Sequence, residues 1–291
     1  MKIHLVDGTY ELFRSFYGPP GKKAPDGMEV GATIYLMRSL LSLITQSKAT
    51  HIACAFDHEI RSFRNQLYSG YKTGDGIDPD LLAQFELAEA AVSAMGIIVW
   101  PMVEFEADDA IATAAVRFAN SPQVKQIVIC SPDKDLCQLV VQDSIVCWDR
   151  RREILYDEIA VKEKYGVAPK SIPDFLGLVG DSADGIPGIK GWGAKSTSKI
   201  LSQVDHIEDI DAAVLTTAFS QGRAKSLSQN LFANLDDALL FRQLTRLRLD
   251  VPIKERVEDL KWRGPSEDLE EFCSNVGIPD FPEKVIAAYK K

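Results

Sequence analysis

Short apolar runs alternate with helical patterns in the first half of the chain. Runs rich in β-branched residues span residues 2–7, 51–57 and 126–133, and each leads to an aspartate. Apolar residues at helical spacing follow over residues 28–46, and a shorter helical pattern covers residues 136–140. This alternation predicts βαβ units, and therefore an α/β fold with a mostly parallel, doubly wound sheet.

The second half of the chain has a mainly helical pattern. Helices are predicted over residues 157–165, over residues 172–179, and through most of the remaining sequence. We therefore expect an α/β core over residues 1–155 and a mainly helical region over residues 156–291. Residues 59–79 are rich in Arg, Tyr, Gly and Asp, which predicts a mobile excursion over the ligand-binding site.

Composition narrows the class of protein. No stretch approaches the roughly 20 apolar residues that a bilayer span requires, and the N-terminus lacks a signal-peptide pattern, so a cytoplasmic protein is expected. The five cysteines are odd in number and lack the paired spacing of zinc sites, which indicates reduced core residues.

Carboxylates cluster where a parallel sheet binds its ligands. Three follow the apolar strands, and two pairs, Glu106 with Asp109 and Asp181 with Asp184, lie three residues apart. Each alone has an ordinary structural explanation, as a helix-dipole partner or a turn residue. Together they would repel one another strongly unless cations are bound, and hard oxygen ligands suit Mg²⁺ or Mn²⁺. The set is Asp7, Asp57, Glu106, Asp108, Asp109, Asp133, Asp135, Asp181 and Asp184.

The net charge of the chain is related to this set of carboxylates. The formal charge is −9, and the nine carboxylates could account for all of it. With metals bound, the rest of the surface would be neutral or locally basic, so the acidic pI does not exclude DNA as a partner. Two ions about 3.5–4 Å apart would support hydrolysis at phosphorus without a histidine or serine nucleophile.

A glycine-rich stretch over residues 185–199 forms a second candidate site. Its small residues favour a tight turn that leads into a helix whose free N–H groups can face a phosphate. Lys190, Lys195, Ser196 and Lys199 would strengthen that contact without reading bases. A plain helix–turn–helix connection is the structural alternative.

These motifs resemble those of the 5′ nuclease family, which includes flap endonucleases, phage 5′ exonucleases and the 5′ nuclease domain of bacterial DNA polymerase I. The resemblance implies a PIN-like sheet, a helical arch over about residues 59–95, and a helix–three-turn–helix DNA-binding motif over about residues 172–203. The matching blocks include Phe56-Asp57, Phe63-Arg64, Tyr71-Lys72, Glu106-Ala-Asp-Asp109, Asp133-Lys-Asp-Leu136, Gly180-Asp-Ser-Ala-Asp184 and Ile186-Pro-Gly-Ile189.

The resemblance also implies roles for individual residues. The acids from Asp7 to Asp109 would hold one metal site and those from Asp133 to Asp184 the second, with Mg²⁺ or Mn²⁺ as the cofactor. Catalytic roles fall on Asp7, Asp57, Asp109, Lys72 and Arg14. A potassium ion would bind the backbone carbonyls of Ile186, Ile189 and Trp192. DNA contacts fall on Tyr71, Lys72, Arg64, Gly188, Lys190, Gly191, Gly193, Lys195, Ser196 and Lys199.

One position departs from the polymerase-type pattern. That pattern has an arginine shortly after the lysine of the arch, whereas Lys72 is followed by Thr-Gly-Asp-Gly. Loss of a group that stabilises transition-state charge typically costs a few kcal/mol. Arg14, Arg61 and Arg64 are candidates to replace it.

The sequence thus predicts a free-standing, metal-dependent 5′-to-3′ exonuclease or flap endonuclease. Its partner would be DNA with a 5′ end, flap or branch, and we expect a monomer that does not bind membranes and acts in DNA repair or replication. One alternative is a catalytically silent, structure-selective DNA-binding protein of the same fold. A toxin-like ribonuclease is another, although such domains lack the glycine-rich stretch.

Overall fold

The expected parallel sheet is present in the computed structural model, which describes residues 1–290. Four strands lie in the order β3–β2–β1–β4, and every neighbouring pair among them is parallel. They are β1 (Lys2–Asp7), β2 (His51–Asp57), β3 (Ile98–Met102) and β4 (Gln126–Cys130). β1 and β2 are buried along almost their whole length, as expected for strands covered by helices on both faces.

The chain divides into two units. The first comprises residues 1–60, 74–131 and 248–291, and the second comprises residues 61–73 and 132–247. This division differs from the expected one in two ways: residues 132–155 belong to the second unit, and the last 44 residues of the sequence return to the first.

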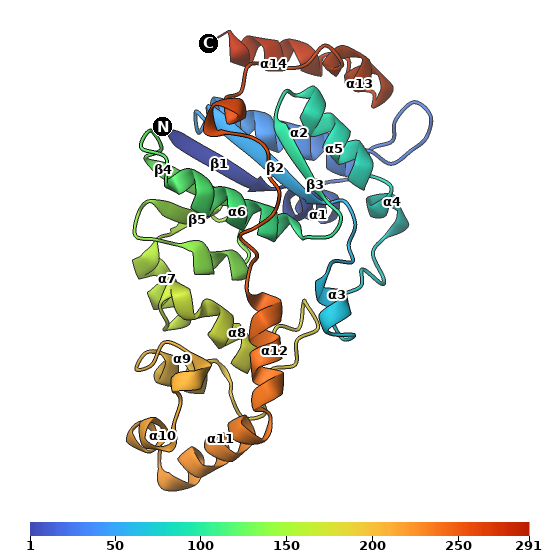
Figure 1. Cartoon of the computed structure of the whole chain (residues 1–291). Helices are drawn as coiled ribbons and strands as arrows, with labels where there is room; N and C mark the ends of the chain where they lie inside the picture. The colour runs from blue at the N-terminus through green and yellow to red at the C-terminus, as the bar shows by residue number, and fades with distance from the viewer. Residues whose placement is uncertain (291) are drawn as a thin grey trace. The chain divides into compact units, whose positions relative to one another are not determined.

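Helices cover the sheet of the first unit (Figure 1). α6 contacts all four strands, whereas α1 and α5 pack with α2, and α13 and α14 pack on α5 and α2. Their bounds are α1 (Gly8–Tyr17), α2 (Gly31–Thr45), α4 (Pro79–Leu82), α5 (Phe85–Ala94), α6 (Ala107–Ala119), η4 (Val257–Leu260), α13 (Leu269–Asn275) and α14 (Phe281–Tyr289).

The second unit is mainly helical, as its sequence predicts. A small antiparallel pair, β5 with β6, precedes the helices, and α8 packs against α9 and α12. The elements are α3 (Arg64–Leu67), η1 (Asp135–Leu139), β5 (Ile145–Asp149), β6 (Ile154–Tyr156), α7 (Glu158–Tyr165), η2 (Pro169–Ser171), α8 (Ile172–Val179), α9 (Ala194–Leu201), η3 (Ile207–Asp209), α10 (Ala212–Ala218), α11 (Gln221–Ala233) and α12 (Leu235–Thr245).

Local signals explain where several helices begin and end. The Asp157 carboxylate accepts a hydrogen bond from Ala160 N at 2.8 Å, which caps α7, and Gly166 ends the helix with φ of 72°. The predicted helix over residues 172–179 matches α8. The helical pattern after β4 forms a 3₁₀ helix of five residues, η1, as is common for a short connecting segment.

Part of the segment expected to form an arch packs in the core of the first unit. Phe85, Ala88 and Val92 on α5 are buried, and α5 packs against α2 and β3 in the core of the first unit. Residues 85–94 therefore do not belong to an arch. What remains is the pair of four-residue helices α3 and α4, which belong to different units, with their connecting residues.

Two expectations from composition can be compared with the structure. All five cysteines are buried and unbridged, as predicted. Within residues 1–290, none of the helices has the length and apolar character needed to cross a bilayer.

Candidate functional site

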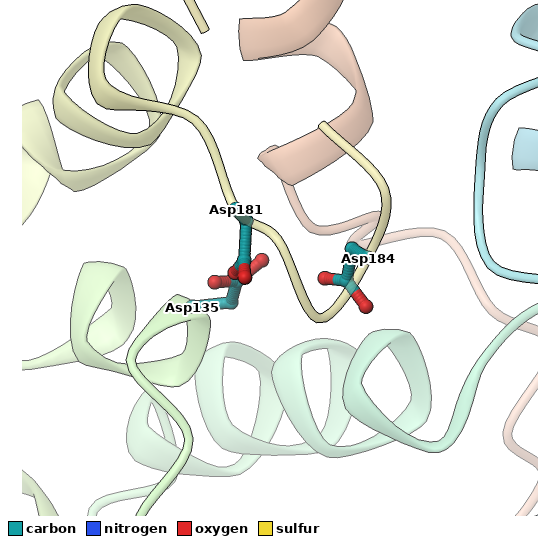
Figure 2. A group of neighbouring side chains, drawn as sticks. All are labelled: Asp135, Asp181 and Asp184. Carbon is teal, nitrogen blue, oxygen red and sulfur yellow. The ribbon is translucent and has the colours of Figure 1, made fainter. Parts of the chain in front are cut away.

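Three of the predicted metal ligands meet in the second unit (Figure 2). Oxygens of Asp135, Asp181 and Asp184 all lie within 4.8 Å of one another. Asp135 comes from η1, and the other two come from the loop after α8. Asp181 and Ile186 close this loop with two reciprocal backbone hydrogen bonds of 2.8 and 2.7 Å, which places both loop carboxylates beside η1.

Asp135 is the carboxylate of this cluster whose negative charge is most disfavoured by burial and by neighbouring carboxylates. It is 6% exposed, and its Oδ1 has no hydrogen-bond partner within the described residues. Burial, followed by the charges of Asp133, Asp184 and Asp181, raises the pKa of Asp135 well above its usual range. A buried carboxylate oxygen without a partner, in a set of hard oxygen donors, fits a divalent cation.

Two lysines lie against the same cluster. Lys134 Nζ is 2.7 Å from Asp181 Oδ2, and Lys72 Nζ is 3.0 Å from Asp184 Oδ1. Burial lowers the pKa of Lys134, but the hydrogen bond to Asp181 and the surrounding carboxylates outweigh it, so the net direction is upward. Both ammonium groups therefore offset part of the carboxylate charge.

The fourth predicted acid of this site, Asp133, lies outside the group of three. Asp133 is exposed, and its Oδ1 accepts a hydrogen bond from the backbone N–H of Asp135 at 2.9 Å. It shapes the first turn of η1 and adds negative charge beside Asp135. Its role as a ligand remains a prediction.

Acids of the first unit lie at the carboxyl edge of the sheet, as predicted. Asp7 ends β1, and its Oδ1 caps α1 by accepting from Tyr10 N at 2.8 Å. Asp57 ends β2, and its Oδ1 accepts from Ala107 N, the first residue of α6, also at 2.8 Å. Since the Asp57 N–H donates to Thr9 Oγ1, the ends of β1 and β2 and the start of α6 meet here.

Asp109 is tied to the backbone by both oxygens. Its Oδ2 accepts from Glu106 N at 3.0 Å, and its Oδ1 accepts from Arg248 N at 2.9 Å, while its side chain is fully buried. Asp109 therefore fixes the start of α6 and the segment that follows α12. Asp108 is half-buried and Glu106 is buried, and the metal-binding roles of all three remain predictions.

Arg14 is anchored between two helices of the first unit. Its Nη2 donates to Ser39 Oγ on α2 at 3.0 Å and pairs with the buried Glu11 on its own helix. About a quarter of the side chain (26%) stays exposed, while Nε of the guanidinium is buried. A catalytic role for Arg14 remains a prediction.

The glycine-rich stretch opens onto a cavity of about 650 Å³ in the second unit. Lys190, Lys195 and Ser196 line it, together with Gly191 and Gly193, as the phosphate-binding prediction requires. The remaining lining residues are Pro187, Ile189, Trp192, Ala194 and Arg223, so no acidic side chain of the described chain borders the cavity.

Two further predictions for this stretch have different outcomes. Gly188 has φ of 68°, and a Cβ there would lie 2.5 Å from Gly180 N, so this turn requires glycine. Lys199 is absent from the cavity lining, and its Nζ lies 5.1 Å from the centre of the Phe219 ring. A DNA contact from Lys199 would therefore form outside the cavity.

Arg64 and Tyr71, both expected to contact DNA, are buried at 2% and 3% exposure. Arg64 Nε donates to Leu244 O at 2.7 Å and its Nη2 donates to Arg246 O at 3.4 Å. These carbonyls lie at the end of α12, so the guanidinium caps that helix. The structure corrects both predictions, because neither side chain is presented at the surface.

Replacing Arg64 with Ala is expected to destabilise the second unit by about 3 kcal/mol, because it leaves the buried carbonyl of Leu244 and the partly buried carbonyl of Arg246 without this donor. Arg64→Lys should recover only part of this loss, since an ammonium group lacks the planar fork of donors. Urea unfolding of the full chain measures both. Wild-type stability of Arg64→Ala would contradict the capping role.

Sequence reasoning missed two groups at these sites. Lys134 lies between the predicted ligands Asp133 and Asp135 in the sequence. This alternation of negative and positive charge could have indicated that the lysine lies close to the carboxylates. Arg223, which lines the cavity, was not indicated by any motif, because it lies 32 residues after its partner Gly191.

Comparison with protein families covers most of the chain. Residues 2–166 match the model for the 5′-3′ exonuclease N-terminal resolvase-like domain. Residues 167–268 match the model for the 5′-3′ exonuclease C-terminal SAM fold. The two matches are contiguous and end before α13.

Two curated relatives differ in how much of their own length matches. A 5′-3′ exonuclease of Aquifex aeolicus is 32% identical over 264 residues, covering 90% of this chain and 87% of the relative. DNA polymerase I of Bacillus caldotenax is 30% identical over 291 residues, covering 98% of this chain but 32% of the relative. The chain thus spans about a third of the DNA polymerase I relatives that it matches.

Solved structures share the fold at low sequence identity. The phage T5 D15 protein co-crystallised with metal ions has a TM-score of 0.66 at 19% identity, with 99% and 100% of the two chains covered. The catalytic core of Rad2 in complex with DNA substrate has a TM-score of 0.61 at 15% identity, with 99% and 92% covered. With the two contiguous family matches and the 32% identical Aquifex relative, the chain belongs to the 5′-3′ exonuclease family.

Proposed function

We propose that this protein is a divalent-metal-dependent 5′-to-3′ exonuclease and flap endonuclease that hydrolyses DNA phosphodiester bonds near 5′ ends or branches. The observation that carries the proposal is the cluster of Asp135, Asp181 and Asp184, with a buried carboxylate oxygen that lacks a partner within the described residues. Family membership supports the proposal, because Asp135 lies within the match to the N-terminal domain of the 5′-3′ exonucleases, and Asp181 and Asp184 lie within the match to their C-terminal domain.

The residues that would hold the metals form two sets, one in each unit. Asp133, Asp135, Asp181 and Asp184 would form one site, and Asp7, Asp57, Glu106, Asp108 and Asp109 the other. Divalent ions at such sites supply the Lewis acidity that activates water and offsets negative charge at phosphorus. Mg²⁺ is the first candidate, because a few carboxylates with several water ligands suit it, and Mn²⁺ is a substitute.

Lys72 has a positioning role in this proposal. Its backbone N–H donates to Asp184 O at 3.1 Å, and its Nζ pairs with the carboxylate of the same residue. The chain therefore holds this ammonium group, one third exposed (33%), against a proposed metal ligand. Transfer of Nζ from Asp184 to a substrate phosphate would couple metal binding to substrate binding.

The substrate assignment rests on the DNA-binding features of the second unit. The cavity beside the glycine-rich stretch offers Lys190, Lys195 and the first N–H groups of α9 to a phosphate. We also propose potassium binding by the carbonyls of Ile186, Ile189 and Trp192, since a carbonyl oxygen already in one backbone hydrogen bond retains a second lone pair. A structural relative, the T5 D15 flap endonuclease, is described in complex with DNA and metal ions, which supports the same substrate class.

Cleavage of a 5′-labelled flap by the full chain tests the proposal. Short 5′ products should form with Mg²⁺ or Mn²⁺ and disappear with EDTA, and a matched RNA flap should be cut more slowly. Tight, structure-selective binding without cleavage in either metal would favour the catalytically silent alternative. Faster cleavage of RNA would favour a ribonuclease.

A further inference from the structure

One face of α11 forms hydrogen bonds with the glycine-rich stretch. Three residues of this helix, Arg223, Leu227 and Asn230, follow the i, i+4, i+7 spacing that places side chains on one helical face. They contact three consecutive residues of the stretch, which are Gly191, Trp192 and Lys190. The sequence offers no motif for this arrangement.

Each of the three contacts is a hydrogen bond. Arg223 Nη2 donates to Gly191 O at 2.7 Å, and Asn230 Nδ2 donates to Lys190 O at 2.8 Å. The buried indole of Trp192 donates through Nε1 to Leu227 O at 3.2 Å. α11 thus fixes the carbonyls and the aromatic ring that shape the tip of the stretch.

Arg223 has N–H groups that remain available for a further hydrogen bond. Its Nη2 also donates to Ser196 Oγ at 3.1 Å, so both bonds of the side chain to the glycine-rich stretch use the same nitrogen. A guanidinium carries five N–H groups, and those on Nε and Nη1 have no partner within the described residues. The side chain is exposed and lines the cavity with Lys190 and Lys195.

The position of Arg223 is electrostatically unfavourable for α11 in the absence of a bound anion. It lies in the first turn of α11, where the helix dipole disfavours a cation. No acidic residue lines the cavity within the described chain, so the arginine adds a third positive charge to two lysines. An anion in the cavity would relieve this repulsion, and the remaining N–H groups of the guanidinium can form charge-assisted hydrogen bonds with a phosphate.

We propose that Arg223 is a DNA-phosphate ligand and Asn230 a positioning residue, so that the backbone-binding site is built from the glycine-rich stretch and α11 together. The inference rests on the proposed function as a DNA nuclease and extends its DNA site beyond the family motif. Arg223 donates to the phosphate through its Nη1 N–H groups while Nη2 holds Gly191 and Ser196. Asn230 contributes no charge and acts only through the shape of the stretch.

Salt dependence of DNA binding separates these roles. A fluorescent 5′-flap duplex is titrated with the full chain in Ca²⁺ over a series of KCl concentrations. Arg223→Ala should weaken binding about tenfold and reduce the slope of log affinity against log salt by about one unit. Asn230→Ala should weaken binding with an unchanged slope. Lys225→Ala, an exposed charge two residues along α11 and therefore on another face, should match wild type in both measurements.

Lys195→Ala is the internal reference. If it lowers the slope while Arg223→Ala leaves it at the wild-type value, the role of Arg223 is overturned and the DNA site stands. If wild type binds the flap without any salt dependence, the proposed DNA function itself fails. Arg223→Lys, which keeps the charge, should retain the slope and lose part of the affinity. A melting temperature for each variant excludes unfolding as the cause.

Discussion

Asp135→Asn is expected to abolish cleavage and at the same time to stabilise the metal-free protein. The substitution keeps the size of the side chain but removes a buried charge beside Asp133, Asp181 and Asp184. Cleavage of a 5′ flap in Mg²⁺ should fall by about 10³-fold or more, because a proposed metal ligand is lost. In EDTA the free energy of unfolding should rise by about 1 kcal/mol, since removal of like-charge repulsion and desolvation is favourable.

The gain in folding stability on addition of Mg²⁺ is a third test of this prediction. A ligand that binds only the folded state stabilises it by about 2.7 kcal/mol at a concentration 100 times its dissociation constant. Wild type should therefore gain stability as Mg²⁺ is added, and Asp135→Asn should gain much less. Undiminished Mg²⁺ stabilisation, or a variant less stable than wild type in EDTA, would contradict the assignment of Asp135 as a metal ligand.

Asp149 supplies the matched control for a buried aspartate in the same unit. It is 3% exposed at the end of β5, and its Oδ1 accepts from the backbone N–H groups of Arg151 and Arg152, both at 3.1 Å. Its charge is satisfied by those donors, so Asp149→Asn should lower stability by about 1–2 kcal/mol. Cleavage by the folded fraction should stay near wild type. The two aspartates thus have opposite expected signs for stability.

The sites differ in how far their sequence predicts them. Asp7, Asp57 and the start of α6 could be placed correctly because apolar strands and helix starts are local patterns, and a parallel sheet brings their ends together. Asp181 and Asp184 could be paired for a similar reason, since the loop that holds them closes within six residues. Short sequence separation made these predictions possible.

Residues that act over long separations were assigned wrongly or missed. Arg64 was interpreted as a DNA contact because the Phe63-Arg64 block resembles the family motif, whereas its burial depends on the Leu244 carbonyl, 180 residues later in the chain. Arg223 was missed because its partner Gly191 is 32 residues away and no pattern links them. The return of residues 248–291 to the first unit is of the same kind, because a helical pattern does not show where a helix packs.

The second large effect is expected from Asp174, a fully buried carboxylate on α8. Its Oδ1 accepts from Ile207 N at 3.0 Å and from Arg242 Nη1 at 3.1 Å, and its Oδ2 is 3.1 Å from His206 Nδ1. One side chain therefore joins α8 to η3 and α12. Asp174→Ala leaves a cation and a backbone N–H without their buried partner, and should destabilise the second unit by about 3–5 kcal/mol.

Arg242 allows a comparison of two carboxylates on the same cation. It also pairs with Glu208 through two hydrogen bonds of 2.5 and 2.6 Å, but Glu208 is 52% exposed. Because solvent screens that pair, Glu208→Gln should cost only about 0–1 kcal/mol despite its shorter contacts. Urea unfolding, with hydrogen exchange of the α8 and α12 amides, measures both variants. Equal losses would show that Arg242 is held by its exposed pair, and that burial of Asp174 does not set the stability of this unit.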